Sequence, residues 1–302
     1  MAEPRSLDPA SRARIRDAFD GAASRYDEQA VLQHQVAADL DERLDLIRIA
    51  PRRILDIGTG TGRLAAALGE RYRDAHVVAA DLAPGMVAAA RSRAGGRRRW
   101  PWRARRFGFA VADIEGLPFA DASFDLVTSN VTLQWCPEPR VAFEEVRRVL
   151  RPGGLFMFST FGPDTLWELR RAWEAVDGGT HVNGFPDMHD LGDDLVRARF
   201  ADPVMDTAHF TLTYPDVRAL MRDLKGIGAH TVLGGRRAGL MGRGALATLE
   251  AAYEPLRQCD RLPSTWEVVH GHAWAPETPH QQRSGDTTTV SLDQLRGSVS
   301  RT

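Results

Sequence analysis

The stretch that decides the fold is Ile54-Leu55-Asp56-Ile57-Gly58-Thr59-Gly60-Thr61-Gly62-Arg63-Leu64, in which a short apolar run is followed by glycine at every second position. Such a run is typical of a buried strand. Glycine lets the backbone turn sharply into a following helix, and it lets a ligand approach the backbone without a side chain in between. The stretch therefore predicts a strand, a tight turn and a helix whose first N–H groups point toward a ligand.

The segments on either side continue this alternation of short apolar strands with helices, which predicts a parallel sheet covered on both faces. Two helices are expected before the first strand, at 9–24 and 28–48. The expected strands are 53–56, 76–80, 107–112, 124–129, 154–161, 204–213 and 265–275. The other expected helices are 63–71, 84–93, 139–150, 165–176, 189–199, 215–224 and 243–258.

The composition is that of an ordinary globular chain, with 302 residues, 43% hydrophobic and 26% charged residues, and a net charge of -1. This balance gives no argument for nucleic acid or a membrane as a partner, and it does not indicate an oligomeric state. No apolar run approaches the ~20 residues of a membrane span, so a cytoplasmic location is expected. Cys136 and Cys259 are expected to be buried thiols, and the polar stretch 277–302 a disordered tail.

Asp56 decides between two cofactors that fit the glycine loop. Residues Gly60 to Ala65 can be written as G-x-G-x-x-A, which would bind NAD with Asp81 on the ribose. However, a carboxylate at the end of the first strand would repel a pyrophosphate. It would attract the sulfonium and ammonium groups of S-adenosylmethionine, and this second cofactor is therefore favoured.

The ends of the next two strands agree with that choice. Asp81 can accept hydrogen bonds from both ribose hydroxyls, Asp113 can accept one from the adenine amino group, and Ile114 can pack on the ring. The expected cofactor-binding residues are Asp56, Gly58, Thr59, Gly60, Gly62, Asp81, Leu82, Met86, Asp113, Ile114 and Asn130.

In this order and spacing, the motifs between about 26 and 161 resemble those of the class I S-adenosylmethionine-dependent methyltransferases. The resemblance implies an α/β, Rossmann-like sheet of seven strands in the order 3-2-1-4-5-7-6, with strand 7 antiparallel. It also implies that helices in residues 1–50 cap the cofactor site. The methyltransferase domain would then span 51–276, with helical lid elements at about 164–200 and 215–258.

A narrower resemblance is to the malonyl-acyl carrier protein O-methyltransferases of biotin synthesis. It rests on the stretches 19–33, 129–139, 158–173, 220–232 and 253–274. It implies methylation of the free carboxylate of a malonyl thioester, with acyl carrier protein as the partner. Two alternatives stay open: a relative of the complex I assembly factors that hydroxylate an arginine, which share the 162–170 and 224–228 patterns, and a methyltransferase for another small acid or a quinone precursor.

A carboxylate acceptor has a pKa of about 4 and is already ionised at neutral pH, so its methylation needs no general base. The sequence agrees, because it contains no Ser-His-Asp arrangement and no obvious base within a motif. His270 and His272 alternate on one expected strand, but no third ligand lies within sequence reach. We therefore expect no metal.

Positioning of the substrate is assigned to Tyr26, Arg222 and Lys225. Lys225 is the single lysine among 39 basic residues and lies one helical turn from Arg222; the pair could hold the carboxylate or simply lie at the surface. Tyr26 could cap the cofactor and contact the substrate, or pack in the core. Gln134, Trp135 and Trp167 are expected to bind substrate.

The segment 95–109 holds six arginines and two tryptophans, Trp100 and Trp102. We expect an exposed loop. Three interpretations stay open: a solvated surface loop, a loop that binds phosphates or bases, or a docking site for an acidic acyl carrier protein.

Overall fold

A seven-stranded sheet in the order β3-β2-β1-β4-β5-β7-β6 forms the centre of the chain, as expected. The computed structural model describes residues 8–95, 106–177, 181–227, 243–277, 282–284 and 287–289. The strands are β1 (Arg53–Ile57), β2 (His76–Asp81), β3 (Phe107–Val111), β4 (Phe124–Asn130), β5 (Leu150–Phe161), β6 (Ala201–Tyr214) and β7 (Leu262–Trp274). β1 to β5 pair in parallel, and β7 runs antiparallel to both β5 and β6.

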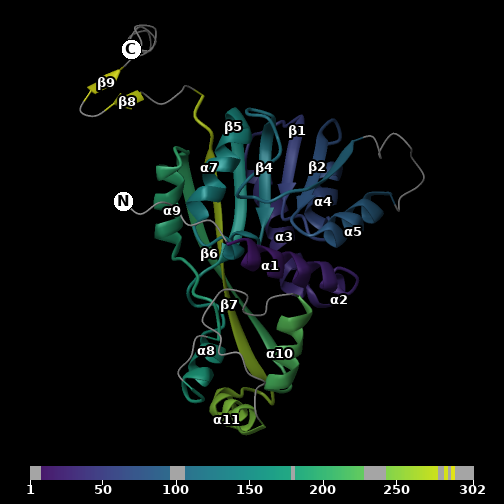
Figure 1. Ribbon diagram of the computed structural model, residues 1–302, viewed down its shortest axis with the longest axis vertical. Helices are drawn as coiled ribbons and strands as arrows, with labels where there is room; N and C mark the ends of the chain where they lie inside the picture. Colours follow the sequence, from purple (N-terminus) through teal and green to yellow (C-terminus); the bar gives the residue numbers. More distant parts are fainter. Residues whose placement is uncertain are drawn as a thin grey trace.

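Helices cover both faces of this sheet (Figure 1). α7 (Pro139–Val149) and α9 (Met188–Arg197) share one core cluster with Leu55 and Ile57, whereas α3 (Val31–Arg43) and α4 (Arg63–Arg71) share another with Ile54. Successive strand residues point to opposite faces, so a strand buried on both sides is apolar throughout. Asp56 shares a face with Ile54, and its side chain therefore belongs to the side of the sheet covered by α3 and α4. α5 (Pro84–Gly95) packs on β2 and β3.

At one end of the molecule β6 and β7 extend beyond their neighbours and carry a second group of helices (Figure 1). These are α8 (Trp167–Glu174), α10 (Val217–Gly226) and α11 (Arg243–Tyr253). They bury a separate apolar core that includes Phe161, Leu220 and Trp266. We call this group, with the extended ends of β6 and β7, the helical lobe. Its helices fall within the expected lid elements at about 164–200 and 215–258, but α9, also expected in the lid, packs on the sheet instead. The role of the lobe as a substrate lid stays a prediction.

The N-terminal helices lie across the molecule between the sheet and the helical lobe (Figure 1). α1 (Pro9–Ala22) begins at Asp8, whose carboxylate accepts hydrogen bonds from the N–H groups of Ala10 and Ser11. Such a cap satisfies N–H groups that have no partner within the helix. The single helix expected at 28–48 is instead divided into α2 (Tyr26–Gln29), α3 and the 3₁₀ turn η1 (Leu44–Leu46).

One expectation outside the sheet is wrong. Cys259 is exposed, whereas Cys136 is buried. The reason is local: Cys259 and Asp260 form a tight turn with φ of 46° and 58°, which places the thiol at the tip of the connection before β7.

Within the stretch expected to be disordered, β8 (Gln282–Ser284) pairs with β9 (Thr287–Thr289) in antiparallel fashion. The rest of that stretch beyond 277 lies outside the described residues. None of the described helices combines the length and apolar character that a membrane crossing requires.

Candidate functional site

The three glycines of the loop after β1 all adopt left-handed backbone conformations, with φ of 69°, 54° and 79° at Gly58, Gly60 and Gly62. Their surroundings differ. A Cβ on Gly62 would lie 2.8 Å from the Cβ of Ala90, so this glycine permits close packing of α4 against α5. A Cβ on Gly60 would meet only the ring of Tyr26, at 3.8 Å. Gly60 is therefore the position at which the backbone is open to a ligand.

Asp81, at the end of β2, is bonded to this loop. Its carboxylate accepts a hydrogen bond from Gly60 N–H at 2.9 Å and another from Ala83 N–H at 2.9 Å. Burial raises the pKa of Asp81 to about 6, and the backbone N–H donors only partly oppose this effect. An ionised carboxylate has about four acceptor positions. Asp81 thus keeps acceptor capacity for hydroxyl groups of a ligand.

Asp56 is more deeply buried than the sequence suggests, with 1% of its surface exposed. Its two oxygens accept hydrogen bonds from the hydroxyls of Thr59 at 2.6 Å and Thr128 at 2.8 Å. Burial raises the pKa of Asp56 to about 6, against these two hydrogen bonds, and the nearby charge of Asp81 raises it further. The two carboxyls therefore lie in a region of negative potential that a cationic ligand would relieve.

Two adjoining chambers open around the glycine loop. The larger is bounded by the ends of β1 to β4 and by α1, and the smaller by α3, α4 and the glycine loop. Asp56 and Thr59 line the smaller chamber only, and Asp81, Asp113 and Ile114 the larger one only. Four residues line both: Tyr26, Gly58, Gly60 and Asn130. Tyr26 thus lies where the two chambers meet.

The N-terminal helices are fastened over these chambers by polar contacts from three elements. Arg12 of α1 forms ion pairs with Asp113 and with Glu115, the latter at 2.6 Å. Asp27 of α2 accepts a hydrogen bond from Thr61 Oγ1 at 2.6 Å and pairs with Arg93 of α5.

A third contact joins α3 to the sheet. The amide of Asn130 donates to the carbonyl of Gln33 at 3.0 Å, and its oxygen accepts from Ser159 Oγ at 2.9 Å. These contacts together hold Tyr26 above Gly60.

Two potential acid–base groups in the larger chamber are held neutral. Burial raises the pKa of the Tyr26 phenol well above its usual range, and the charges of Asp81 and Asp27 add to the effect. Burial likewise raises the pKa of the Cys136 thiol, with Glu115 and Asp113 contributing. At neutral pH the phenol is therefore a hydrogen-bond donor rather than a base, and the thiol is not a nucleophile.

Most of the sequence-predicted residues come together here. The larger chamber is lined by Tyr26, Gly58, Gly60, Asp81, Leu82, Met86, Asp113, Ile114, Asn130 and Trp135. Gly62 and Gln134 line neither chamber: Gly62 packs on α5, and the Gln134 amide donates to the carbonyl of Val131 at 2.7 Å.

The remaining three predicted residues belong to the helical lobe. Arg222 and Lys225 are exposed on α10, Trp167 is 36% exposed on α8, and none of the three lines either chamber. α10 nevertheless ends in close contact with α2. A Cβ on Gly226 would overlap the side-chain amide of Gln29, so glycine is needed where the two helices meet. Lys225 therefore lies next in sequence to the residue where the helical lobe meets α2.

The sequence implied N-terminal helices over the site but did not identify the α1 residues that line it. Arg12, Ile15 and Phe19 line the larger chamber, as do Glu115 and Thr132. The spacing of Arg12, Ile15 and Phe19 places them on one helical face, and that is the only sequence signal for them. Asp113 also differs from expectation, since its carboxylate meets Arg12 as well as the chamber. The arginine segment lies outside the described residues between 96 and 105.

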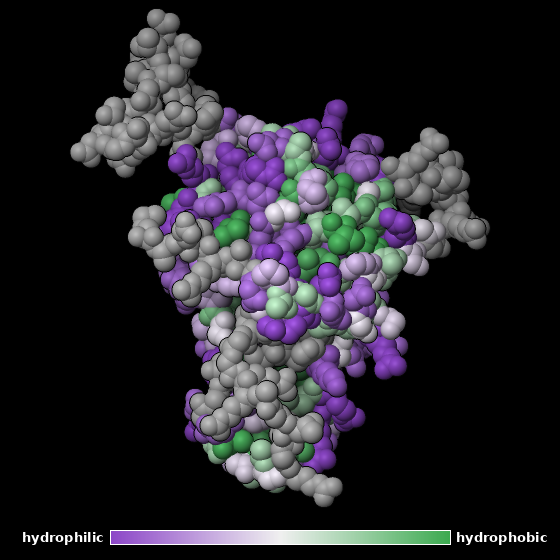
Figure 2. Space-filling model, viewed as in Figure 1, coloured by the Kyte–Doolittle hydropathy of each residue, from purple (hydrophilic) through white to green (hydrophobic). Residues whose placement is uncertain are grey.

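A groove over α5 is a weaker candidate for a binding site. Figure 2 shows apolar surface over α5, and a shallow groove there is lined by Pro84, Val87, Ala88, Arg91, Ser92 and Val111. Ligand sites usually combine apolar walls with several convergent polar groups. The chambers beside the glycine loop have such groups from four strands, so they form the candidate site.

Comparisons with known proteins show which family the chain resembles. Residues 55–158 match a family described as "Methyltransferase domain". A malonyl-[acyl-carrier protein] O-methyltransferase of Laribacter hongkongensis is 52% identical over 91% of this chain and 93% of its own. A malonyl-[acyl-carrier protein] O-methyltransferase of Methylovorus sp. is 50% identical over 88% of this chain and 90% of its own. The crystal structure of a candidate methyltransferase from Bacillus halodurans superposes with a TM-score of 0.56 at 19% identity, over 79% of this chain and 99% of the other, and supports the fold.

Proposed function

Because the chain belongs to the malonyl-[acyl-carrier protein] O-methyltransferase family, we propose that it transfers the methyl group of S-adenosylmethionine to the free carboxylate of malonyl-acyl carrier protein. The observation that carries the proposal is the 52% identity along 91% of the chain. The product is a methyl ester of the malonyl thioester, an early intermediate for biotin synthesis. The cytoplasmic location expected from the sequence stays a prediction.

The residues around the glycine loop fit the methyl donor. Gly60 is free of a side chain where the backbone borders both chambers, and Asp81 beside it keeps acceptor capacity for ribose hydroxyls. Ile114, 6% exposed, offers an apolar wall for the adenine ring. The buried carboxyls of Asp56 and Asp81 supply negative charge for the sulfonium and ammonium groups. S-adenosylmethionine supplies an electrophilic methyl group when it is bound there.

The remaining chemistry is alignment rather than proton transfer. The acceptor carboxylate is ionised at neutral pH, so it attacks the methyl carbon directly and no base is needed. The neutral phenol of Tyr26, where the two chambers meet, is positioned to donate a hydrogen bond to the acceptor. Helix α1 closes the larger chamber with Ile15 and Phe19 and so excludes water from the reacting groups.

A cation is required to hold the acceptor carboxylate until it reacts. We assign this role to Lys225 and Arg222, which are exposed on the helix that ends against α2. Their side chains carry no ion pair to an acidic group among the described residues, so they are available for a substrate carboxylate. The carrier protein then approaches from the helical-lobe side, with its malonyl arm entering beside α2.

The acceptor is tested by release of S-adenosylhomocysteine from a panel of candidates. Malonyl-acyl carrier protein, malonyl-coenzyme A, acetyl-acyl carrier protein, free malonate and a quinone precursor are each incubated with protein and S-adenosylmethionine. We expect release with the two malonyl thioesters and none with the acetyl thioester, which has no free carboxylate. Release only with free malonate or the quinone precursor would contradict the proposal, as would oxygen consumption that depends on added iron.

A further inference from the structure

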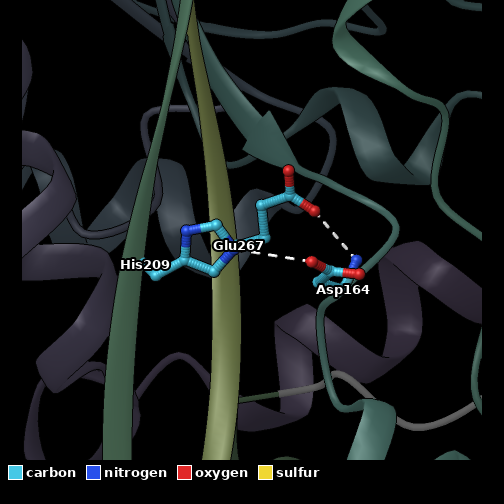
Figure 3. A group of neighbouring side chains, drawn as sticks. All are labelled: Asp164, His209 and Glu267. Carbon is cyan, nitrogen blue, oxygen red and sulfur yellow. Dashed lines mark hydrogen bonds and ion pairs between the residues drawn. The ribbon is translucent and has the colours of Figure 1, made fainter.

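Three side chains of the metal-binding type meet at the root of the helical lobe, away from the chambers. Asp164 comes from the turn between β5 and α8, His209 from β6 and Glu267 from β7 (Figure 3). One ligand atom from each lies within 4.8 Å of the others. His209 and Glu267 are direct partners in the antiparallel pairing of β6 with β7. The group thus joins three segments that are distant in sequence.

The turn that carries Asp164 is fixed to β7 by the backbone around Glu267. Gly162 N–H donates to the carbonyl of Glu267 at 3.0 Å, and Asp164 N–H donates to the Glu267 carboxylate at 2.8 Å. Thr165, fully buried, donates its hydroxyl to the same carbonyl at 3.0 Å. A Cβ on Gly162 would lie 2.5 Å from the carboxyl carbon of Glu267. Glycine at this position is therefore what admits the carboxylate.

The charge of Glu267 is not balanced. The residue is only 8% exposed, yet within the described part of the chain no arginine or lysine pairs with it. The ion-pair partner of Asp164 is His209, at 3.6 Å between Nε2 and Oδ2. Buried carboxylates are normally paired with a cation or coordinate a metal. A divalent cation would balance the charge of the two neighbouring carboxylates beside the imidazole.

We propose that Asp164, His209 and Glu267 bind one divalent transition-metal ion, for which Zn²⁺ is the best match. Zinc takes histidine nitrogen and carboxylate oxygen at about 2.0–2.2 Å in a tetrahedral arrangement, so two of its ligand atoms lie about 3.4 Å apart. The 3.6 Å separation of His209 and Asp164 is close to that value. The side chains of His209 and Asp164 are 51% and 67% exposed and are free to close on the ion by small rotations.

The donor set favours zinc over magnesium and calcium. Mg²⁺ and Ca²⁺ prefer oxygen ligands alone, whereas imidazole favours zinc and its neighbours. Three protein ligands leave at least one position for water. The ion would connect the β5–α8 turn to β6 and β7 and so stiffen the root of the helical lobe. The sequence alone did not reveal this group, because its three ligands are separated by 45 and 58 positions in the printed sequence. Only His270 and His272 were considered there, and no metal was expected.

Calorimetric titration of the chelator-treated, full-length protein with zinc chloride tests the site. Two variants remove a ligand: His209→Ala, at an exposed position, and Glu267→Gln, which keeps the shape and the acceptor for Asp164 N–H. His189→Ala is the matched control, because His189 also pairs with an aspartate, Asp187, at 2.7 Å on an exposed surface. Circular dichroism verifies that each variant is folded.

We expect one zinc ion per wild-type chain, about tenfold or more weaker binding in His209→Ala and Glu267→Gln, and unchanged binding in His189→Ala. Zinc should also raise the Tm of the wild type and the control, and not that of Glu267→Gln. Equal titrations of the wild type and both ligand variants would overturn the proposal, as would no zinc binding by the wild type. Because the readouts are binding and Tm, they are independent of methyl transfer.

Discussion

The carboxylate of Asp81 accepts a hydrogen bond from Gly60 N–H at 2.9 Å, although the two residues are separated by 21 positions. The contact fixes the end of β2 to the glycine loop after β1, at the point where both chambers open. It orients the carboxylate while leaving acceptor positions free.

Gly60 and Gly62 of the loop should respond differently to alanine. Gly62→Ala places a Cβ 2.8 Å from Ala90 at φ 79° and should reduce the free energy of unfolding by about 1–3 kcal/mol. Gly60→Ala has no close neighbour and costs only about 1 kcal/mol for its backbone conformation, but the methyl group borders the chamber. We expect Gly60→Ala to weaken S-adenosylmethionine binding by about tenfold. Urea unfolding and calorimetry measure the two effects, and equal binding losses at equal stability would contradict this division.

Loss of the Arg12 contacts should loosen α1. Arg12→Gln removes the ion pair to Glu115, whose side chain is 3% exposed, and the pair to Asp113. Because Arg12 is itself 31% exposed, we expect a loss of about 1–2 kcal/mol rather than that of a fully buried pair. Cleavage within α1 by trypsin should become faster, and the donor should bind less tightly. Arg16→Gln is the control, since among the described residues Arg16 pairs with exposed Asp17 on the same helix. Similar cleavage of both variants would contradict the role given to the Arg12 contacts.

Donor binding should depend on pH near 6, where Asp56 and Asp81 titrate. A bound cation favours the ionised carboxylates, so the affinity for S-adenosylmethionine should rise by about tenfold or more from pH 5 to pH 7. S-adenosylhomocysteine, which lacks the sulfonium charge, should show a smaller rise. Calorimetry at several pH values measures both ligands. Identical pH profiles would contradict the charge argument.

The same carboxyls predict the sign of the stability change without ligand. Between pH 4 and 6 the folded protein keeps protons on Asp56 and Asp81 that the unfolded chain has released, because burial raises their pKa from 3.8 to about 6. The folded state then binds more protons, so these groups make the free energy of unfolding decrease as the pH rises through this window. The bound donor should reverse much of that loss.

Lys225 should affect binding of the acceptor rather than of the donor. Lys225→Gln removes the proposed partner of the malonyl carboxylate, and we expect KM for malonyl-acyl carrier protein to rise by about tenfold while the Kd of S-adenosylmethionine stays unchanged. Arg218→Gln on the same helix is the control, because Arg218 is already paired with Glu250 at 2.7 Å. A rise in the donor Kd, or equal effects of the two variants, would contradict the assignment.

Local sequence signals predicted the strand ends well and the contacts between distant segments poorly. Asp56, Asp81 and Asp113 each follow or end an apolar run, and parallel strands bring their carboxyl ends to one edge. The pairing of Arg12 with Asp113 spans 101 positions and leaves no periodic trace.

The most direct test of the account is intact-protein mass spectrometry of malonyl-acyl carrier protein after incubation with the protein and S-adenosylmethionine. We predict that the carrier gains one methylene, that fragmentation places it on the terminal malonyl carboxylate, and that acetyl-acyl carrier protein in the same mixture gains nothing. An unchanged mass of malonyl-acyl carrier protein, under conditions where the protein binds S-adenosylmethionine, would contradict the proposed function.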